Sequence, residues 1–340
     1  MRYLVTGCAG FVGYHVTYRL LEKGHHVFGI DGMTEYYDPA LKRARMARLL
    51  SSPNFEWSEL MLEDRPALEA AVRASKAENI IHLAAQAGVR YSLEAPRTYL
   101  SSNIVGTFNL LETIKDVLPA HLLIASSSSV YGGNLEMPFR ETHAADHPLS
   151  HYAATKRAVE VMSHSYAHLW RLPITNMRFF TVYGPWGRPD MALFRFVEAI
   201  RAGESIDVYG EGQMQRDFTY VDDIVEAILR LVDVVPGARR DVQEAGLDTL
   251  SPVAPWRVVN LCGGRPVGLR DFIVLVEKYL GQKAKLNLLP FQKGDPVSTW
   301  GDPSLLHALT GFTPTVELAE GVARFIEWSS RYPSNRGSAT

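Results

Sequence analysis

Residues 2–13 read Arg2-Tyr3-Leu4-Val5-Thr6-Gly7-Cys8-Ala9-Gly10-Phe11-Val12-Gly13, and this stretch decides the fold. An apolar run of strand type leads into three glycines, and a helical pattern follows them and ends at Gly24. Glycine is needed where the backbone turns sharply and approaches a pyrophosphate, while the next helix N-terminus offers NH groups and a positive dipole end. The stretch therefore predicts a dinucleotide-binding turn, although its spacing is GxxGxxG rather than GxGxxG.

A second apolar strand, residues 26–30, follows this helix and ends at Asp31. An acidic side chain about 20 residues beyond the glycines accepts hydrogen bonds from the adenosine ribose and repels a 2′-phosphate. The sequence therefore predicts NAD rather than NADP as the cofactor.

Strands and helices continue to alternate further along the chain. Residues 79–85 and 121–127 have strand patterns, and residues 99–117 between them have long helical periodicity. Such alternation predicts a parallel sheet that is covered on both faces and binds ligands at the carboxyl ends of its strands. The segments at those ends are Ala84-Ala85-Gln86 and Ser126-Ser127-Ser128-Ser129. A serine run can be a plain flexible loop, but its place directly after a strand favours hydroxyls that face the site.

Tyr152 and Lys156 are four residues apart in a helical pattern, which puts both side chains on one face. A nearby ammonium favours the phenolate and lowers the pKa of a tyrosine. Such a tyrosine can take a proton from a sugar hydroxyl as hydride leaves the same carbon for a nicotinamide. Taken alone, the pair is more typical of a surface helix, and the preceding strand and glycine patterns favour the catalytic interpretation.

Composition excludes several classes of protein. The 340 residues suffice for one large core and a smaller lobe, and a net charge of −2 gives no reason to expect nucleic acid or an anionic membrane as partner. Cys8 and Cys262 are isolated, so neither a disulfide framework nor a metal site is expected. No apolar run has the length of a membrane span, and we expect a cytoplasmic protein.

Several motifs occur together in one order, and their combination resembles the nucleotide-sugar branch of the extended short-chain dehydrogenase/reductase family. They are TGCAGFVG, Asp31, HLAAQAGVRYS, SSSSVYGG, HYAATK, RFFTVYGPWGRPDMALF, RDFTYVDDIV and GDPVSTWGD. The resemblance runs from Met1 to about Ser330, and HLAAQAGVRYSLE and RFFTVYGPWGRPDMALF most resemble UDP-glucuronate 4-epimerases. It implies a Rossmann doubly wound parallel sheet with a smaller C-terminal α/β substrate-binding lobe.

The resemblance also implies roles for individual residues. Tyr152 is the expected base, Lys156 binds the nicotinamide ribose and lowers the pKa of Tyr152, and Ser127 bonds the reacting oxygen. The remaining cofactor-binding residues are expected to be Gly7, Gly10, Phe11, Val12, Gly13, Asp31, Leu83, Ala84, Ala85, Gln86, Asn103 and Ser126. The substrate-binding residues are expected to be Arg90, Ser127, Ser128, Ser129, Thr181, Arg188, Asp190, Met191, Ala192, Tyr209, Arg216 and Asp295. Of these, Arg216 matches the arginine on the UDP pyrophosphate, whereas each arginine is also compatible with a surface ion pair.

The implied activity is NAD-dependent 4-epimerisation of UDP-glucuronate to UDP-galacturonate through a 4-keto intermediate, an isomerase reaction that would serve polysaccharide biosynthesis. Related decarboxylases and 4,6-dehydratases carry an acid directly before the VYG-type tripeptide, where this chain has Ser129. The alternatives are epimerisation of UDP-glucose or another UDP-hexose, decarboxylation of UDP-glucuronate, and a non-catalytic nucleotide-sugar or NAD sensor.

Two positions depart from the family pattern near the expected adenosine site. Met61 stands where many relatives have an acid for the adenine amino group, and Gly32 stands where asparagine often follows the aspartate. Adenine recognition is then expected to rest more on backbone and apolar contacts. Asp64 is the alternative acidic partner if the loop shifts in register.

The C-terminal half alternates less regularly. We expect an NAD-binding domain over 1–180, with returning segments at about 210–235 and 256–262, and a mainly substrate-binding lobe over 181–330. Residues 236–255 are predicted to be an exposed insertion and 331–340 a polar tail. Helices at 99–117 and 152–170 match those of a four-helix dimer interface in the family, which implies a homodimer, although their apolar stripes are also compatible with core packing.

Overall fold

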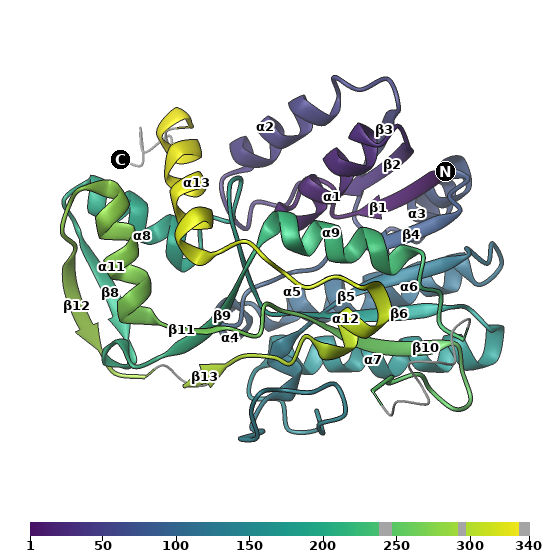
Figure 1. Cartoon of the computed structure of the whole chain (residues 1–340). Coiled ribbons are helices and arrows are strands. Elements are labelled where there is room, and N and C mark those ends of the chain that lie inside the picture. Colours follow the sequence, from purple (N-terminus) through teal and green to yellow (C-terminus); the bar gives the residue numbers. More distant parts are fainter. Residues whose placement is uncertain (238–246, 292–296, 333–340) are drawn as a thin grey trace.

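The computed structural model describes residues 1–237, 247–291 and 297–332 (Figure 1). Within them, seven parallel strands form one sheet in the order β10-β6-β5-β4-β1-β2-β3. The strands are β1 (Arg2–Thr6), β2 (His26–Asp31), β3 (Phe55–Glu59), β4 (Asn79–His82), β5 (His121–Ser127), β6 (Ile174–Phe179) and β10 (Trp256–Leu261). The strand order reverses beside β1, which makes the sheet doubly wound, and the predicted fold class is confirmed.

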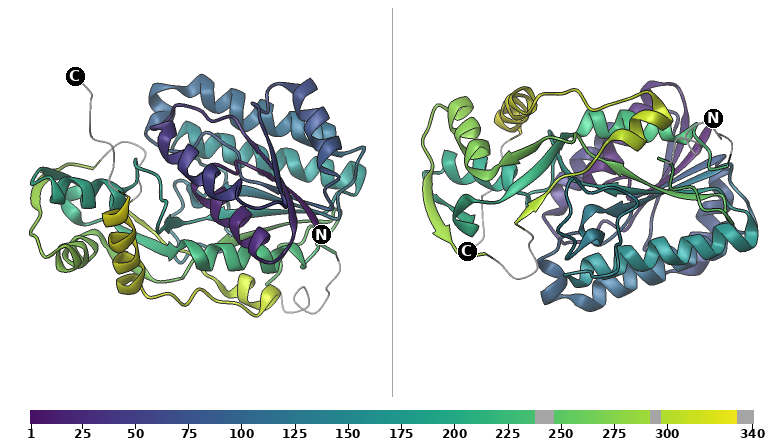
Figure 2. Two further views of the ribbon diagram at one scale, coloured as in Figure 1. Left: turned by 90° about the horizontal axis from the view of Figure 1, so that it is seen from above. Right: turned by 60° about the horizontal axis from the view of Figure 1, so that its bottom comes forward.

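Helices cover both faces of this sheet (Figures 1 and 2). The helices beside the large sheet include α1 (Phe11–Glu22), α2 (Pro39–Leu49), α3 (Arg65–Ser75), α6 (Gly106–Ile114), α7 (His151–Trp170), α9 (Val221–Val232) and α12 (Ser304–Thr310). One apolar cluster packs α1 and α9 against the sheet, and a second packs α3, α6 and α7 against the opposite face. The first cluster continues into the C-terminal lobe, so the two parts of the molecule share a core.

In the described residues, the smaller lobe is built on short sheets and three α-helices. Its strands are β7 (Thr181–Tyr183), β8 (Ser205–Tyr209), β9 (Gln215–Tyr220), β11 (Pro266–Gly268), β12 (Lys285–Leu289) and β13 (Ser298–Thr299), and its helices are α8 (Ala192–Arg201), α11 (Leu269–Leu280) and α13 (Leu318–Arg331). Strand β9 pairs with β7, β11 and β13, whereas β8 pairs with β12. The lobe lies beyond the carboxyl ends of the large sheet's strands, where a doubly wound fold binds its ligands (Figure 1).

Local capping explains where several helices begin. Ser150 caps α7 by accepting a hydrogen bond from the Ala153 NH, and Asp38 and Asp64 cap α2 and α3 in the same way, each shortly before a proline in the first turn. The start of α7 is therefore fixed, and with it the position of Tyr152 in the first turn.

The long helix predicted over 99–117 is interrupted. The structure has two short helices, α4 (Tyr91–Glu94) and α5 (Pro96–Tyr99), then a π-helix η1 (Leu100–Val105), and only then α6. A π-turn shifts the side chains of a helix relative to an α-helical continuation. The shift carries Asn103 inward, so that it lies buried beside the end of β4.

The described part of the predicted insertion is anchored to strand β10. Asp248 forms a buried ion pair with Arg257 at 2.9 Å, and the Thr249 hydroxyl bonds the backbone of Val258. The side chains of Asp248 and Thr249 thus pair with strand β10, whereas Leu247 and Val253 are exposed at 44% and 52%, and the exposed insertion stays a prediction. Residues 238–246 and the tail from 333 lie outside the described part of the chain.

Candidate active site

The glycine turn forms one wall of a cavity of about 290 Å³ at the carboxyl ends of the central strands. Gly7 has a φ of +74°, and a Cβ there would lie 2.7 Å from the Ala84 nitrogen. A Cβ on Gly13 would lie 1.9 Å from the Gly7 oxygen. The N-cap residue of α1 is Gly10, and no side chain accepts a hydrogen bond from the first NH groups of this helix. These NH groups therefore stay available for an anion. These observations fit a bound dinucleotide.

Asp31 lies in the same cavity, and backbone groups fix its carboxylate. Oδ2 accepts a hydrogen bond from Ala9 N at 3.0 Å and Oδ1 accepts one from Met33 N at 2.8 Å. The buried Lys42 ammonium is 3.9 Å from Oδ1 and donates to Thr34. The carboxylate is thus held at the end of β2 with lone pairs left for a ribose.

The predicted cofactor residues at β4 and β5 also meet at this cavity. Its described lining includes Gly7, Gly10, Phe11, Val12, Gly13, Asp31, Leu83, Ala84, Ala85, Gln86, Ser126, Ser127, Tyr152, Lys156, Arg188 and Met191. Asn103 lies behind the lining instead. Its amide oxygen accepts from Gln86 N at 2.8 Å, and its amide nitrogen donates to Gln86 O and to Thr155 Oγ1. Asn103 therefore ties the β4 loop to the helix of Tyr152.

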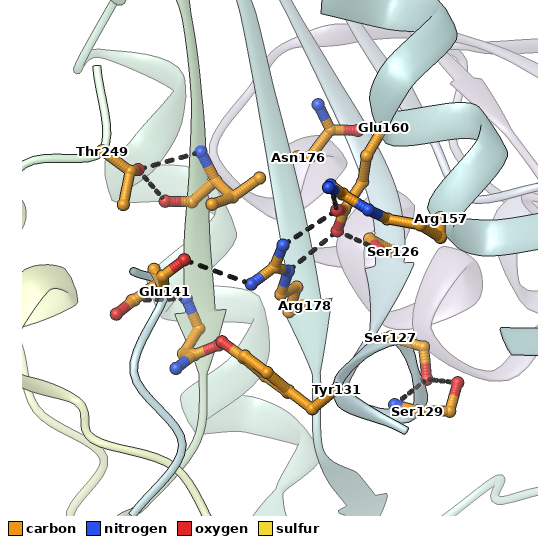
Figure 3. Close-up of polar contacts among 12 residues, drawn as sticks. Ser126, Ser127, Ser129, Tyr131, Glu141, Arg157, Glu160, Asn176, Arg178 and Thr249 are labelled. Carbon is orange, nitrogen blue, oxygen red and sulfur yellow. Dashed lines mark hydrogen bonds and ion pairs between the residues drawn. The ribbon is translucent and has the colours of Figure 1, made fainter. Parts of the chain in front are cut away.

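Tyr152 and Ser127 approach each other from different elements. Tyr152 stands on the first turn of α7 and Ser127 ends β5, and both residues line the cavity. The Ser127 hydroxyl accepts from Ser129 N at 3.2 Å and from Ser129 Oγ at 2.9 Å (Figure 3). A phenol and a serine hydroxyl thus point to a single place where a reacting oxygen would be held.

Lys156 lies one turn further along α7, and its Nζ donates to Ala125 O at 2.8 Å. Burial lowers the pKa of Lys156 to about 8, and the negative charge of Glu160 partly offsets burial. Burial raises the pKa of Tyr152, while the nearby Ser127 hydroxyl and the charge of Arg188 act in the opposite direction. The expectation that Lys156 depresses the pKa of Tyr152 is not met in this structure, because desolvation of the buried phenol outweighs the nearby charges.

At the far end of the cavity, Arg188 forms an ion pair of 2.6 Å with Asp190. The Tyr36 hydroxyl donates to the same carboxylate at 3.0 Å, and the Arg188 guanidinium lies over the Tyr36 ring. Burial, followed by the Asp190 charge, raises the pKa of Tyr36 above its usual value. The loop after β2 is thereby joined to the segment that leads into α8.

Other predicted substrate residues lie outside the described lining. The Arg90 guanidinium lies 4.4 Å from the centre of the Tyr209 ring, and Arg216 on β9 donates to the backbone of Gln215 and Val297. Thr181 begins β7, beside Phe218 of β9. In the chain, Ser128 and Ser129 come directly after the lining residue Ser127, and Asp190 and Ala192 flank the lining residue Met191. Asp295 lies outside the described residues.

The structure adds lining residues that the sequence did not single out. Tyr36, Tyr37 and Lys42 come from the loop after β2 and from α2. Met61 lines the cavity as expected, but its acidic neighbour there is Glu63, which accepts hydrogen bonds from two serines of η1. The alternative of Asp64 as the acidic partner is wrong, because its carboxylate caps α3.

Arg45 of α2 is fully buried and joins two loops of the site. Its Nη1 donates to Ala9 O at 2.8 Å in the glycine turn, and its Nη2 donates to the carbonyls of Trp186 and Gly187. Trp186 itself has a φ of +60°. The cofactor turn and the loop that carries Arg188 are therefore held by one guanidinium. Arg45 belongs to no sequence motif, so no signal in the sequence indicated that it joins these two loops.

Among the described residues, no helix is long and apolar enough to cross a membrane, and no group of histidine, cysteine, aspartate or glutamate side chains has a metal-binding arrangement.

Comparison with known proteins identifies relatives over nearly the whole chain. A protein of Rhizobium meliloti named "Probable UDP-glucuronate 4-epimerase" is 57% identical over 329 residues, 96% of this chain and 96% of that protein. The UDP-glucuronate 4-epimerase of Thermodesulfobacterium geofontis is 40% identical over 328 residues, 96% of this chain and 95% of its own.

A solved structure has the same fold. The UDP-glucuronic acid 4-epimerase from Bacillus cereus, in complex with UDP-glucuronic acid and NAD, matches with a TM-score of 0.87 and 30% identity, covering 98% of this chain and 100% of that one. The model of the NAD dependent epimerase/dehydratase family matches residues 3–241. The chain described here therefore belongs to the NAD dependent epimerase/dehydratase family.

Proposed function

We propose that this protein is an isomerase that inverts C4 of UDP-glucuronate to give UDP-galacturonate, with NAD as its cofactor. The observation that carries the proposal is the meeting of Tyr152, Ser127 and Lys156 in the cavity walled by the glycine turn and Asp31. Relatives named for this reaction align with almost the entire chain, which supports the same substrate here.

Each step draws on a residue of the cavity. Tyr152 takes the proton from the C4 hydroxyl, and Ser127 holds the same oxygen through its hydroxyl. Lys156 binds the nicotinamide ribose and keeps a positive charge near the developing phenolate. When bound, NAD supplies the acceptor and donor of the C4 hydride. The 4-keto sugar then rotates in the site and presents its opposite face. Tyr152 returns a proton to O4, and the configuration at C4 is inverted.

The carboxylate of the sugar needs control, because a 4-keto hexuronate is a β-keto acid and loses carbon dioxide readily. We propose that uncharged donors, Ser128, Ser129 and Thr181, hold the carboxylate in an orientation that resists this loss. Ser129 supports this choice, since its hydroxyl bonds Ser127 and places no acid beside the reacting centre. Arg216 is proposed to bind the UDP pyrophosphate, with Tyr209 at the nucleotide end and Arg90 and Arg188 at the sugar end.

The two lobes are proposed to bind different ligands, and the arrangement of the large sheet supports this assignment. We propose that residues 1–180, with about 210–235 and 256–262, hold the cofactor and that 181–330 mainly hold the UDP-sugar. Strand β10 joins the large sheet and α9 packs against α1, which supports the returning segments. Because the reaction needs a soluble dinucleotide and a nucleotide sugar, we propose that it takes place in the cytoplasm.

Product analysis tests the reaction. Purified protein incubated with UDP-glucuronate and NAD is expected to give UDP-galacturonate as the main product, identified by the C4 proton couplings in NMR spectra of the separated nucleotide sugar. UDP-glucose serves as the neutral comparison and is expected to turn over much more slowly. A UDP-pentose with release of carbon dioxide as the main product, or faster epimerisation of UDP-glucose, would contradict the proposal.

We further propose a homodimer formed through α6 and α7. Several large apolar side chains are exposed there, among them Phe108 at 42% and Val161 at 58%. Exposed apolar patches of this kind are typical of interfaces between subunits.

A double variant tests the dimer. Phe108→Glu with Val161→Glu is expected to weaken self-association by roughly 100-fold or more, since each buried apolar side chain stabilises by about 1.5–3 kcal/mol. Light scattering after size exclusion measures the mass. Val274→Glu, on α11 at 57% exposure, is the matched control and is expected to leave the mass at that of the dimer. A wild-type monomer, or a dimeric double variant, would contradict the assignment.

A further inference from the structure

Tyr152, Lys156 and Glu160 follow one another at four-residue spacing on helix α7, and His164 and His168 continue the series. The first two belong to the proposed chemistry, whereas Glu160 lies one turn deeper with its side chain fully buried. A carboxylate without solvent must be paired and hydrogen-bonded to remain ionised. The contacts of Glu160 therefore show what its charge is used for.

Two strands of the large sheet supply the partners of Glu160 (Figure 3). Arg178 of β6 donates from Nε to Oε1 and from Nη2 to Oε2, both at 2.9 Å, in a two-pronged ion pair. Ser126 of β5 donates its hydroxyl to Oε1 at 2.6 Å. Arg157 approaches Oε2 at 3.1 Å from the solvent side. Burial raises the pKa of Glu160, but the charge and hydrogen bonds of Arg178 outweigh burial and keep the pKa below its usual value.

This arrangement reaches the catalytic residues from two directions. Ser126 precedes Ser127 in the chain, so its bond to Glu160 fixes the end of β5 against α7. The Arg178 guanidinium also lies 4.7 Å from the centre of the Tyr131 ring, and Tyr131 ends the short helix η2 (Ser128–Tyr131) that follows the serines. The serine segment is thus held at both ends by one ion pair.

The charge of Glu160 also acts on Lys156, which lies one turn away on the same helix. Around Lys156, β5 offers the uncharged Ala125 carbonyl and α7 offers Tyr152 and Glu160. His82 of β4 is held neutral, because burial, followed by the charge of Lys156, lowers the pKa of His82 to about 3. Glu160 is therefore the carboxylate that offsets the desolvation of the buried ammonium.

Stability alone is a poor explanation for this ion pair. Buried ion pairs are often no more stabilising than apolar side chains of similar volume, since both charges lose their hydration. Packing between α7 and β6 could be achieved with apolar residues, as elsewhere on this face of the sheet. The position of the pair beside Lys156 and Ser126 points to a role in the reaction.

We infer that Glu160, held by Arg178, is a positioning residue of the active site that keeps the buried Lys156 cationic and fixes the β5 end that carries Ser127. The catalytic aspect of this inference rests on the proposed function. The electrostatic aspect does not, since it concerns the charge of Lys156 alone.

The test compares Glu160→Gln with Glu160→Asp. Glu160→Gln keeps the size of the side chain and removes its charge, so Lys156 is expected to lose its proton at lower pH. Activity requires Lys156 in its protonated form. The activity is therefore present below the pKa of Lys156 and is lost as pH rises through that value. The alkaline limb of kcat therefore moves to lower pH, and kcat at pH about 9 falls by roughly tenfold or more, with a much smaller loss at pH about 6. Glu160→Asp keeps the charge, so the alkaline limb of its pH profile of kcat is expected to stay near that of the wild type.

Asp248→Asn is the matched control, because it breaks another buried ion pair at 2.9 Å on the neighbouring strand β10. It is expected to lower the melting temperature without moving the limb. Should Glu160→Gln fold poorly around the unpaired guanidinium, the double variant Glu160→Gln with Arg178→Gln removes both charges and is expected to move the limb in the same direction by a smaller amount.

A direct readout needs no substrate. NMR titration of protein labelled with ¹³C at the lysine ε-carbons, with Lys156→Gln to assign the signal, is expected to show the Lys156 transition at lower pH in Glu160→Gln than in wild type. An unchanged Lys156 transition, or a limb that moves equally in Asp248→Asn, would overturn the inference. Absence of epimerase activity in the wild type would instead contradict the proposed function and leave the titration decisive for Glu160.

Discussion

Replacing Tyr152 by phenylalanine is expected to lower kcat for UDP-glucuronate by roughly 10³-fold or more, because general acid–base groups contribute about 10²–10⁴-fold and this one acts in both directions of the reaction. The ring stays in place, so its edge contact with Tyr99 is kept. Only the phenol hydroxyl of this lining residue is lost. Substrate affinity measured by calorimetry is therefore expected to change only a few-fold, which separates loss of the base from loss of the site.

Tyr166→Phe is the matched control for this experiment. It removes a hydroxyl from the same helix, but that hydroxyl donates to Glu112 at 2.6 Å and lies away from the cavity. Activity is expected to stay close to that of the wild type. A Tyr152→Phe enzyme with substantial turnover would refute the assignment of the base.

The second large effect is expected from Gly13→Ala. A Cβ at this position would lie 1.9 Å from the Gly7 oxygen and 2.7 Å from the Gly7 carbonyl carbon, so the glycine turn must move. Overpacking of this severity destabilises by about 3 kcal/mol or more, and the displaced turn no longer offers its NH groups to a pyrophosphate. We expect NAD to bind roughly 100-fold more weakly, measured by calorimetry, together with a lower melting temperature.

Gly24→Ala separates the effect of space from the effect of backbone conformation. Gly24 has a φ of +77° but open space around it, so an alanine there is destabilised only by its left-handed conformation, about 1–2 kcal/mol. NAD affinity is expected to be unchanged in this variant. A Gly13→Ala protein that binds NAD as tightly as the wild type would show that the turn is not the cofactor cradle.

The sheet was predictable because its signals are local. The apolar runs that end at Asp31 and Ser127 are short and continuous, as buried parallel strands require, and glycines or small residues mark their ends. The helix that carries Tyr152 and Lys156 was predicted from their four-residue spacing and from the match of residues 152–170 to helices of the family. Residues at strand ends then follow from topology, since parallel strands place their carboxyl ends at one edge.

Interactions between distant segments were not predictable in this way. The π-helix that buries Asn103 follows from its bonds to Gln86 and Thr155, which no pattern within residues 99–117 indicates. Lys42 and Glu63 enter the cavity from ordinary polar stretches, so their burial depends on tertiary packing. The pKa of Tyr152 was misjudged for the same reason, because desolvation depends on every element around the phenol.

The Arg45 contact bears on which changes in sequence the site can tolerate. Its acceptors at Ala9, Trp186 and Gly187 are main-chain carbonyls, which every amino acid provides. Neighbouring side chains on both loops can therefore diverge between relatives while the bridge itself persists, provided that the backbone path and the single arginine are retained. In a chimera joined between α2 and the loop after β7, the arginine would come from one parent and the carbonyl groups of residues 186 and 187 from the other. The bridge between the two loops would then form across the junction.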